Sequence, residues 1–317
     1  MKVAVTGSSG LIGTALTASL RADGHQVVRL VRRPPRADGE RAAGDSAASE
    51  VRWDPRAADA GDPPLSGVDA VVHLAGAGVG DHRWTPSYKA EIRASRVLAT
   101  TALATALANT GLAAAQPRPK TFITASAIGW YGDTGGREVT ESTPAGKAFL
   151  SRVVHDWEAA ADPARAAGIR VAHVRSGLVL GAGGGVLGRL APPARFGLLP
   201  RFGNGHQVMS WIALTDEVRA IRFLLDGPGA DERTGPYNLT APSAVTNGEL
   251  TAALHAAFRR PDFPWLRVPA PLLKLGLGEM SSELLTSARV LPARLLEAGF
   301  EFSYPTIGAA LAAELPR

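Results

Sequence analysis

The chain has 317 residues, a formal net charge of +5 and no cysteine. Without thiols there is no disulfide, cysteine nucleophile or cysteine-ligated metal, so the fold must be stabilised by core burial alone. A composition of 45% apolar and 20% charged residues is typical of a globular protein. The arginines are scattered rather than clustered, which argues against a nucleic-acid-binding protein, and the seven histidines have no ligand spacing, so we predict no metal site.

Two uncharged stretches, residues 3–20 and 97–117, superficially resemble a signal peptide and a membrane span. Polar residues and glycines at 6–10 interrupt the first stretch after three apolar residues. The second is mostly Ala and Thr, and we interpret it as a buried helix. The sequence therefore predicts a cytoplasmic protein without a membrane contact, and it carries no signal for an oligomeric state.

Strands and helices alternate along the first half of the chain. The predicted strands are 2–6, 26–31, 51–53, 70–74, 121–126 and 170–174, and the predicted helices are 11–22, 86–109 and 148–167. This alternation is typical of an α/β fold with a doubly wound parallel sheet of the Rossmann type. Residues 34–64, rich in Pro, Gly, Asp and Arg, interrupt it as a surface excursion around one short strand.

The character of the sequence changes after residue 177, where glycine-rich loops precede a Leu-rich helical tail punctuated by proline. We predict a dinucleotide-binding Rossmann domain over residues 1–178, to which 211–240 return. Residues 179–210 and 241–317 would form a smaller substrate-binding region.

Three glycines at a spacing of three lie between the first strand and the first helix. Gly7 would allow a tight turn, Gly10 would let the backbone approach a pyrophosphate, and Gly13 would let the helix pack on the strand. Amides at the helix start would face the anion. The predicted cofactor-binding residues of this loop are Gly7, Ser9, Gly10, Leu11, Ile12 and Gly13.

The end of the second strand distinguishes between the two nicotinamide cofactors. An NAD site usually has Asp or Glu there to accept from the ribose 2′-hydroxyl, whereas this chain has Arg32 and Arg33. Two guanidinium groups can hold a 2′-phosphate, so we predict NADP(H). The alternative is that one or both arginines simply face solvent.

Several motifs together resemble the extended short-chain dehydrogenase/reductases, and more narrowly their atypical "epimerase family protein" branch. They are residues 6–13, 73–76, 124–132, 83–85, 156–158, 174–181, 203–207 and 210–212, with a tail over 291–305 that resembles the branch's C-terminal domain of unknown function. The resemblance covers essentially the whole chain. It implies NADP binding, a Rossmann domain and a small C-terminal substrate domain.

By this resemblance the nicotinamide half of the cofactor would lie at the carboxyl ends of the middle strands. The residues expected near it are Leu74, Ala75, Gly76, Ser126, Arg175 and Gly177. A small polar substrate would lie between Trp130, Tyr131, His82 and the 203–207 loop, where Asn204 is the candidate contact.

The family's usual proton relay, a tyrosine followed four residues later by lysine, is absent: none of the four tyrosines has lysine at that spacing. Leu150 and Val154 occupy the corresponding helix positions. Ser126 and Tyr131 remain as catalytic candidates, against the alternatives that Ser126 caps backbone groups and that Tyr131 forms a pocket wall with Trp130. Two functions stay open: an NADP(H)-dependent oxidoreductase or epimerase, and a non-catalytic NADP(H)-binding redox sensor or interaction module.

Overall fold

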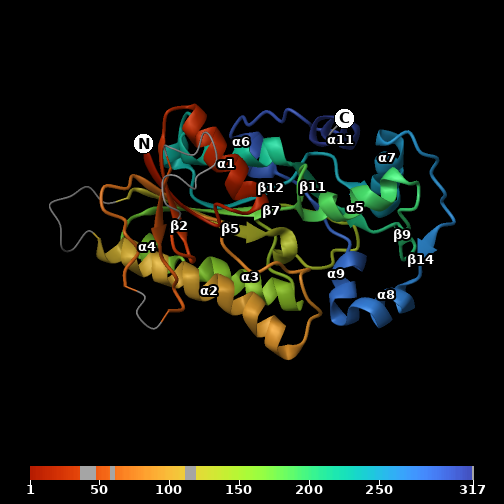
Figure 1. The fold of residues 1–317 in the computed structure, drawn as a ribbon, viewed down its shortest axis with the longest axis horizontal. Coiled ribbons are helices and arrows are strands. Elements are labelled where there is room, and N and C mark those ends of the chain that lie inside the picture. Colours follow the sequence, from red (N-terminus) through yellow and green to blue (C-terminus); the bar gives the residue numbers. More distant parts are fainter. Residues whose placement is uncertain (36–47, 58–60, 111–118, 316–317) are drawn as a thin grey trace.

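The computed structural model describes residues 1–35, 48–57, 61–110 and 119–315. Its centre is a sheet of seven parallel strands in the order β12-β7-β5-β4-β1-β2-β3 (Figure 1). These strands are β1 (Lys2–Thr6), β2 (Gln26–Val31), β3 (Ala48–Arg52), β4 (Ala70–His73), β5 (Thr121–Ala127), β7 (Arg170–Ser176) and β12 (Gly235–Leu239). The predicted doubly wound parallel sheet is confirmed. Of the surface excursion predicted over 34–64, residues 36–47 and 58–60 lie outside the described residues.

Helices cover both faces of this sheet. On one face, α1 (Leu11–Ala22) and α6 (Leu214–Leu225) pack against β1 and β4 through residues such as Leu16, Ile221 and Val72. On the other face lie α2 (Pro86–Asn109), α3 (Phe149–Ala159) and α4 (Asp162–Ala166) (Figure 1). Leu103 and Phe122 are fully buried there. Residues 97–109 belong to α2, so this part of the chain is a helix packed on the sheet.

The helix predicted over 148–167 is wrong in one respect, because the structure divides it into α3 and α4. Pro163 is the cause. Proline has no N–H to donate to the preceding turn and disfavours a helical residue before it, but it fits the first turn of a new helix.

The second half of the chain forms smaller elements around the sheet's carboxyl edge. Its helices are α5 (Gly185–Arg195), α7 (Asn247–Ala257), α8 (Ala270–Leu277), α9 (Ser281–Leu285), α10 (Ala293–Glu297) and α11 (Ile307–Glu314). Strands of two or three residues also pair in this region. These pairs are β15 (Arg289–Val290) with β6 (Glu138–Val139), β14 (Arg267–Val268) with β9 (Arg201–Phe202), β10 (Val208–Met209) with β13 (Val245–Thr246), and β11 (Trp211–Ala213) with β8 (Leu178–Leu180). The start of α6 is tied to this region, because the buried Asp216 carboxylate accepts from the Ser303 and Tyr304 amides at 2.9 and 2.8 Å.

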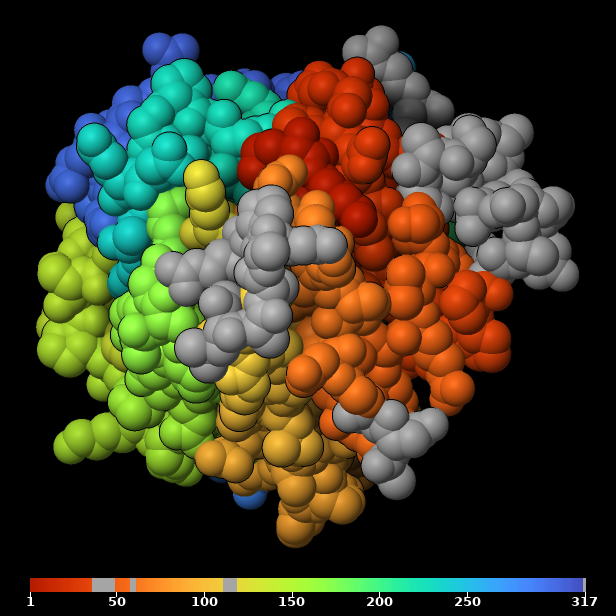
Figure 2. All heavy atoms as spheres, turned by 90° about the vertical axis from the view of Figure 1, so that its left-hand side faces the viewer, coloured from red at the N-terminus to blue at the C-terminus, as the bar shows by residue number. Residues whose placement is uncertain are grey.

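The amino ends of the strands lie on the opposite side of the molecule. Backbone hydrogen bonds there run from Asp69 to Lys2, from Lys120 to Asp69 and from Arg170 to Lys120. Figure 2 looks onto this side, where red N-terminal, orange and cyan segments reach one surface. The carboxyl ends of the strands, where parallel sheets bind ligands, therefore point toward the second half of the chain.

Candidate functional site

The glycine loop between β1 and α1 has the geometry of an anion-binding turn. Gly7 has φ +65°, and a Cβ on it would lie 2.6 Å from the Leu74 carbonyl carbon; a Cβ on Gly13 would lie 2.2 Å from the Gly7 carbonyl oxygen. A Cβ on Gly10 would meet one described heavy atom within 4 Å, the Gly7 oxygen at 3.4 Å. The turn and packing roles predicted for Gly7 and Gly13 agree with these contacts, while Gly10 has only this one close neighbour among the described residues.

The start of α1 is itself open to an anion. No side chain caps the helix and its first turn has no acidic residue. Ser9 is exposed, and Leu11 and Ile12 begin the helix with amides that an incoming oxygen could accept from.

The two arginines at the end of β2 have different contacts, although the sequence predicts the same role for both. Arg33 is held by Glu50 of β3, with Nη2 2.7 Å from Oε1, whereas Arg32 is exposed and has no ion pair within the described part of the chain. Arg29 reaches the same carboxylate at 3.4 Å and donates from Nε to Ser8 Oγ at 3.1 Å. The sequence prediction missed Glu50 because this carboxylate arrives on a neighbouring strand.

The loop after β4, residues 74–78, lies between the glycine loop and α2. Leu74 and Ala75 pack directly against Gly7. The Ala77 amide donates to Ser95 Oγ at 3.1 Å, and a Cβ on Gly76 would lie 3.4 Å from the Arg96 guanidinium carbon. The predicted ribose-binding residues therefore adjoin the glycine loop.

A buried polar network occupies the carboxyl ends of β5 and β7. Ser126 donates to Glu158 at 2.6 Å, and Arg175 donates to both oxygens of Glu158 at 2.8 Å. Arg175 is 2% exposed, stacks 3.9 Å from the Trp130 ring centroid and donates from Nη1 to the Tyr131 hydroxyl. Burial raises the pKa of Glu158, but the Arg175 hydrogen bonds and nearby positive charges outweigh it and leave this pKa lowered.

Arg175, which we predicted to border the nicotinamide, is held within this network. Its guanidinium contacts Glu158, Trp130 and Tyr131, and its place beside the nicotinamide stays a prediction. Gly177, expected beside it, has a packing reason to lack a side chain, since a Cβ there would lie 2.7 Å from the Ser210 carbonyl oxygen.

Tyr131, the other catalytic candidate, belongs to the same buried network. It is 4% exposed, and its hydroxyl donates to Asn238 Oδ1 at 2.7 Å while accepting from Arg175. Burial raises the pKa of Tyr131 to about 12 even though Arg175 acts in the opposite direction. These contacts favour the alternative of an aromatic wall with Trp130, and the proton-donor role of Tyr131 stays a prediction.

The residues predicted to hold the substrate are not brought together. His82 lines a shallow pocket of about 350 Å³ with Arg83 and Tyr88. Trp130 lines a separate cleft of about 530 Å³ with Glu158 and His173. Asn204 is exposed, and its side chain caps its own turn by accepting from the His206 amide.

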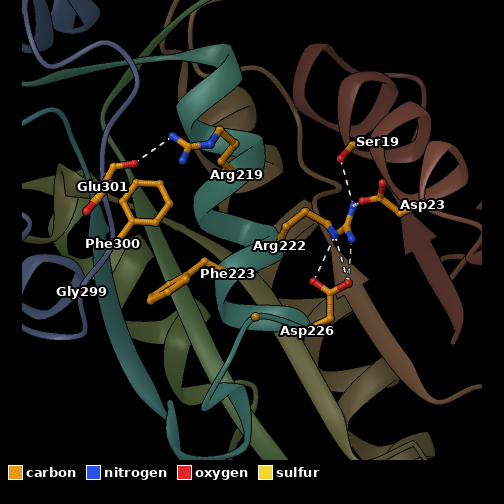
Figure 3. A pocket seen from close by; sticks show the side chains of 10 residues that line it. Ser19, Asp23, Arg219, Arg222, Phe223, Asp226, Gly299, Phe300 and Glu301 are labelled. Carbon is orange, nitrogen blue, oxygen red and sulfur yellow. Dashed lines mark hydrogen bonds and ion pairs between the residues drawn. The ribbon is translucent and has the colours of Figure 1, made fainter.

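Another pocket, of about 520 Å³, lies between α1 and α6, away from the glycine loop (Figure 3). Its arginines are neutralised: Arg222 contacts Asp23 and Asp226, and Arg219 contacts Asp216. Across the described residues there is no cluster of three or more possible metal ligands and no helix long and apolar enough to cross a membrane.

The parallel sheet and the glycine loop define a dinucleotide-binding protein of the Rossmann type. Residues 3–240 match the model of the NAD dependent epimerase/dehydratase family, and residues 268–314 match a domain of unknown function. The chain belongs to the NAD dependent epimerase/dehydratase family.

Similar proteins extend over its whole length. An epimerase family protein of Mycobacterium leprae is 44% identical over 98% of this chain and 94% of its own length. The human epimerase family protein SDR39U1 is 35% identical over 98% of both chains. A crystal structure of the human protein with NADPH has a TM-score of 0.84, with 34% identity and 99% of each chain covered. The Corynebacterium glutamicum nucleoside-diphosphate sugar epimerase, at 36% identity and a TM-score of 0.76, covers 99% of this chain and 58% of that one.

Proposed function

We propose that this chain binds NADP(H) at the carboxyl edge of its sheet and acts as an oxidoreductase or epimerase on a small polar metabolite. The observation that carries the proposal is the sparse packing of described residues around Gly10 at the uncapped start of α1. A diphosphate fits such a position because backbone amides and the helix dipole both favour negative charge. The NADPH bound in the human relative's crystal structure supports the same cofactor class.

The residues present can hold each part of this cofactor. Gly10 and the amides of Leu11 and Ile12 would bind the diphosphate, and Arg32 would bind the 2′-phosphate. Arg33 would join Arg32 only by sharing its guanidinium with Glu50, so Arg32 is expected to carry most of the preference for phosphorylated cofactor. When bound, NADP(H) would supply or accept the hydride.

Cofactor titrations test the proposal. We expect NADPH to bind at least about tenfold more tightly than NADH, and Arg32→Ala to remove most of that difference, because a charge-assisted hydrogen bond contributes about 1.5–3 kcal/mol. Arg21→Ala is a control, since Arg21 lies in the last turn of α1, away from the helix start. Equal affinities of the wild-type protein for NADPH and NADH would refute the NADP(H) assignment.

A second candidate is a non-catalytic NADP(H)-binding sensor or interaction module. Apolar Leu150 and Val154 at the positions of the usual relay favour it, as does the engaged hydroxyl of Tyr131. Two assays separate these functions: NADPH oxidation at 340 nm with small aldehydes and ketones, and chromatography of nucleotide sugars incubated with NADP⁺, because an epimerase returns the hydride and leaves no net change at 340 nm. Turnover in either assay supports the enzyme, whereas tight NADPH binding without turnover in both supports the sensor.

A further inference from the structure

The cations of α2 differ in how they are neutralised. Lys89 pairs with Glu279 at 2.6 Å, and Arg93 pairs with Asp156 at 2.8 Å. Arg96 is more deeply placed than Arg93, yet it has no ion pair with any residue that the structure describes. A partly buried cation without a carboxylate is costly unless another group compensates it.

The contacts of Arg96 fix its side chain and leave one edge of the guanidinium available. Nη1 donates to the Ile92 carbonyl at 3.0 Å, and the guanidinium carbon lies 5.1 Å from the Trp157 ring centroid. Within the described ranges, Nε and Nη2 have no hydrogen-bond partner, and the side chain keeps partial exposure. Burial lowers the pKa of Arg96 to about 10, so it stays charged at neutral pH.

The loop after β4 places Arg96 beside the cofactor site. Gly76 has no side chain to cover the guanidinium, and a Cβ there would lie 3.4 Å from its central carbon. On the α2 side, Ser95 accepts from the Ala77 amide and Tyr88 donates to the Gly78 carbonyl. One face of α2 thus holds the loop that packs on Gly7.

The direction of a bound dinucleotide follows from the strand order. Its 2′-phosphate end lies at β2, its diphosphate lies at the start of α1, and its other half must continue toward β4 and β5, which lie on the other side of β1. Arg96 is on that second half of the path. Trp157, on which it stacks, lies one helical turn after Val154, the apolar residue in the usual lysine position.

We propose that Arg96 is the cation that contacts the nicotinamide half of bound NADP(H), supplied from α2 instead of from α3. Its Nε and Nη2 would donate to oxygen atoms of the nicotinamide ribose or the adjacent phosphate. This inference rests on the proposed NADP(H)-binding function, and it gives the site a positive charge that the missing lysine no longer provides. A guanidinium stays protonated near neutral pH, so the role of Arg96 would be to bind and orient the cofactor and not to transfer a proton.

Two ligands test the inference on the full chain: NADPH, and adenosine 2′,5′-bisphosphate, which contains only the adenine half. Arg96→Met, which keeps an apolar stem against Trp157, should weaken NADPH binding about tenfold or more and leave the bisphosphate within about twofold. Arg93→Met, on the same helix but paired with Asp156, is the matched control and should change neither.

Three outcomes overturn the inference. The first is that Arg96→Met leaves NADPH binding unchanged. The second is that Arg96→Met weakens both ligands equally, as expected if the side chain only holds the loop, and the third is that Arg93→Met has the same effect as Arg96→Met. Should Arg96→Met fail to fold, Arg96→Gln keeps an uncharged polar end group, and the same changes in binding are expected for it. A wild-type protein that binds neither ligand would refute the proposed function itself, whereas binding of both with no effect at Arg96 would refute only this assignment.

Discussion

Replacing Glu158 by leucine is expected to destabilise the protein more than any change at an exposed ion pair. The side chain accepts three hydrogen bonds, one from Ser126 and two from Arg175, and the two charged partners are 10% and 2% exposed. Without Glu158, Arg175 keeps only the Tyr131 hydroxyl and the Trp130 ring as partners. Leaving one member of a buried pair without its partner costs about 3–5 kcal/mol.

This free energy converts into a change in melting temperature. With about 2.1 cal/mol/K of unfolding entropy per residue, 317 residues give about 0.7 kcal/mol/K, so Glu158→Leu should lower Tm by about 4–7 °C if unfolding is two-state. Thermal unfolding followed by circular dichroism, with urea unfolding as a second measure, tests the value. Asp156→Asn on the same helix breaks the exposed pair with Arg93 and should cost at most about 1 kcal/mol.

The double variant Glu158→Leu/Arg175→Met tests whether the loss of stability comes from an unpaired charge or from lost packing. Because replacing a whole buried ion pair by apolar residues is often near neutral, the double variant should recover most of the loss. If it is as unstable as Glu158→Leu alone, or if Glu158→Leu changes Tm by less than about 2 °C, the charge argument is refuted.

Three other changes give distinct results. Gly13→Ala should lower stability, because its Cβ meets backbone at 2.2 Å. Gly10→Val should leave Tm within a few degrees and abolish NADPH binding. Retained binding would contradict the assignment of the cofactor site to this loop. Tyr131→Phe should lower the free energy of unfolding in urea by about 1–2 kcal/mol, because two buried hydrogen bonds are lost, and it should leave any turnover within about tenfold. A larger loss of turnover would support the proton-donor role. Burial raises the pKa of Glu217 to about 8, so its carboxyl group stays protonated to a higher pH in the folded state than in the unfolded state. The contribution of this group to the free energy of unfolding is therefore present below about pH 4.5 and lost as the pH rises through 8. Glu217→Gln should therefore have a higher Tm than the wild type at pH 9 but not at pH 4. An equal difference in Tm at both pH values would contradict the raised pKa of Glu217.

The parts of the fold that the sequence predicted are those set by local pattern. The strand at 2–6, the helix at 11–22 and the glycine spacing between them depend on neighbours within a few residues, so their geometry agrees with the prediction. The division of α3 from α4 is also local, and Pro163 is the signal that would have predicted it.

The site contacts that the sequence did not predict join distant segments. The hydroxyl of Tyr131 donates a hydrogen bond to Asn238, which lies 107 residues later in the chain. Ser126 and Arg175 are register partners on β5 and β7, and only the packing of α3 beneath them brings Glu158 between the two. No spacing in the sequence encodes that register, so the network could not be predicted.

The late residues Leu295 and Phe300 belong to the same buried cluster as Val3 and Val5 of the first strand. A ribosome delivers the chain from its N-terminus, so the part of this cluster beside β12, which α10 contacts, would remain uncovered until almost all of the chain has emerged. During that interval the nascent protein would be a substrate for chaperones that bind exposed apolar strands.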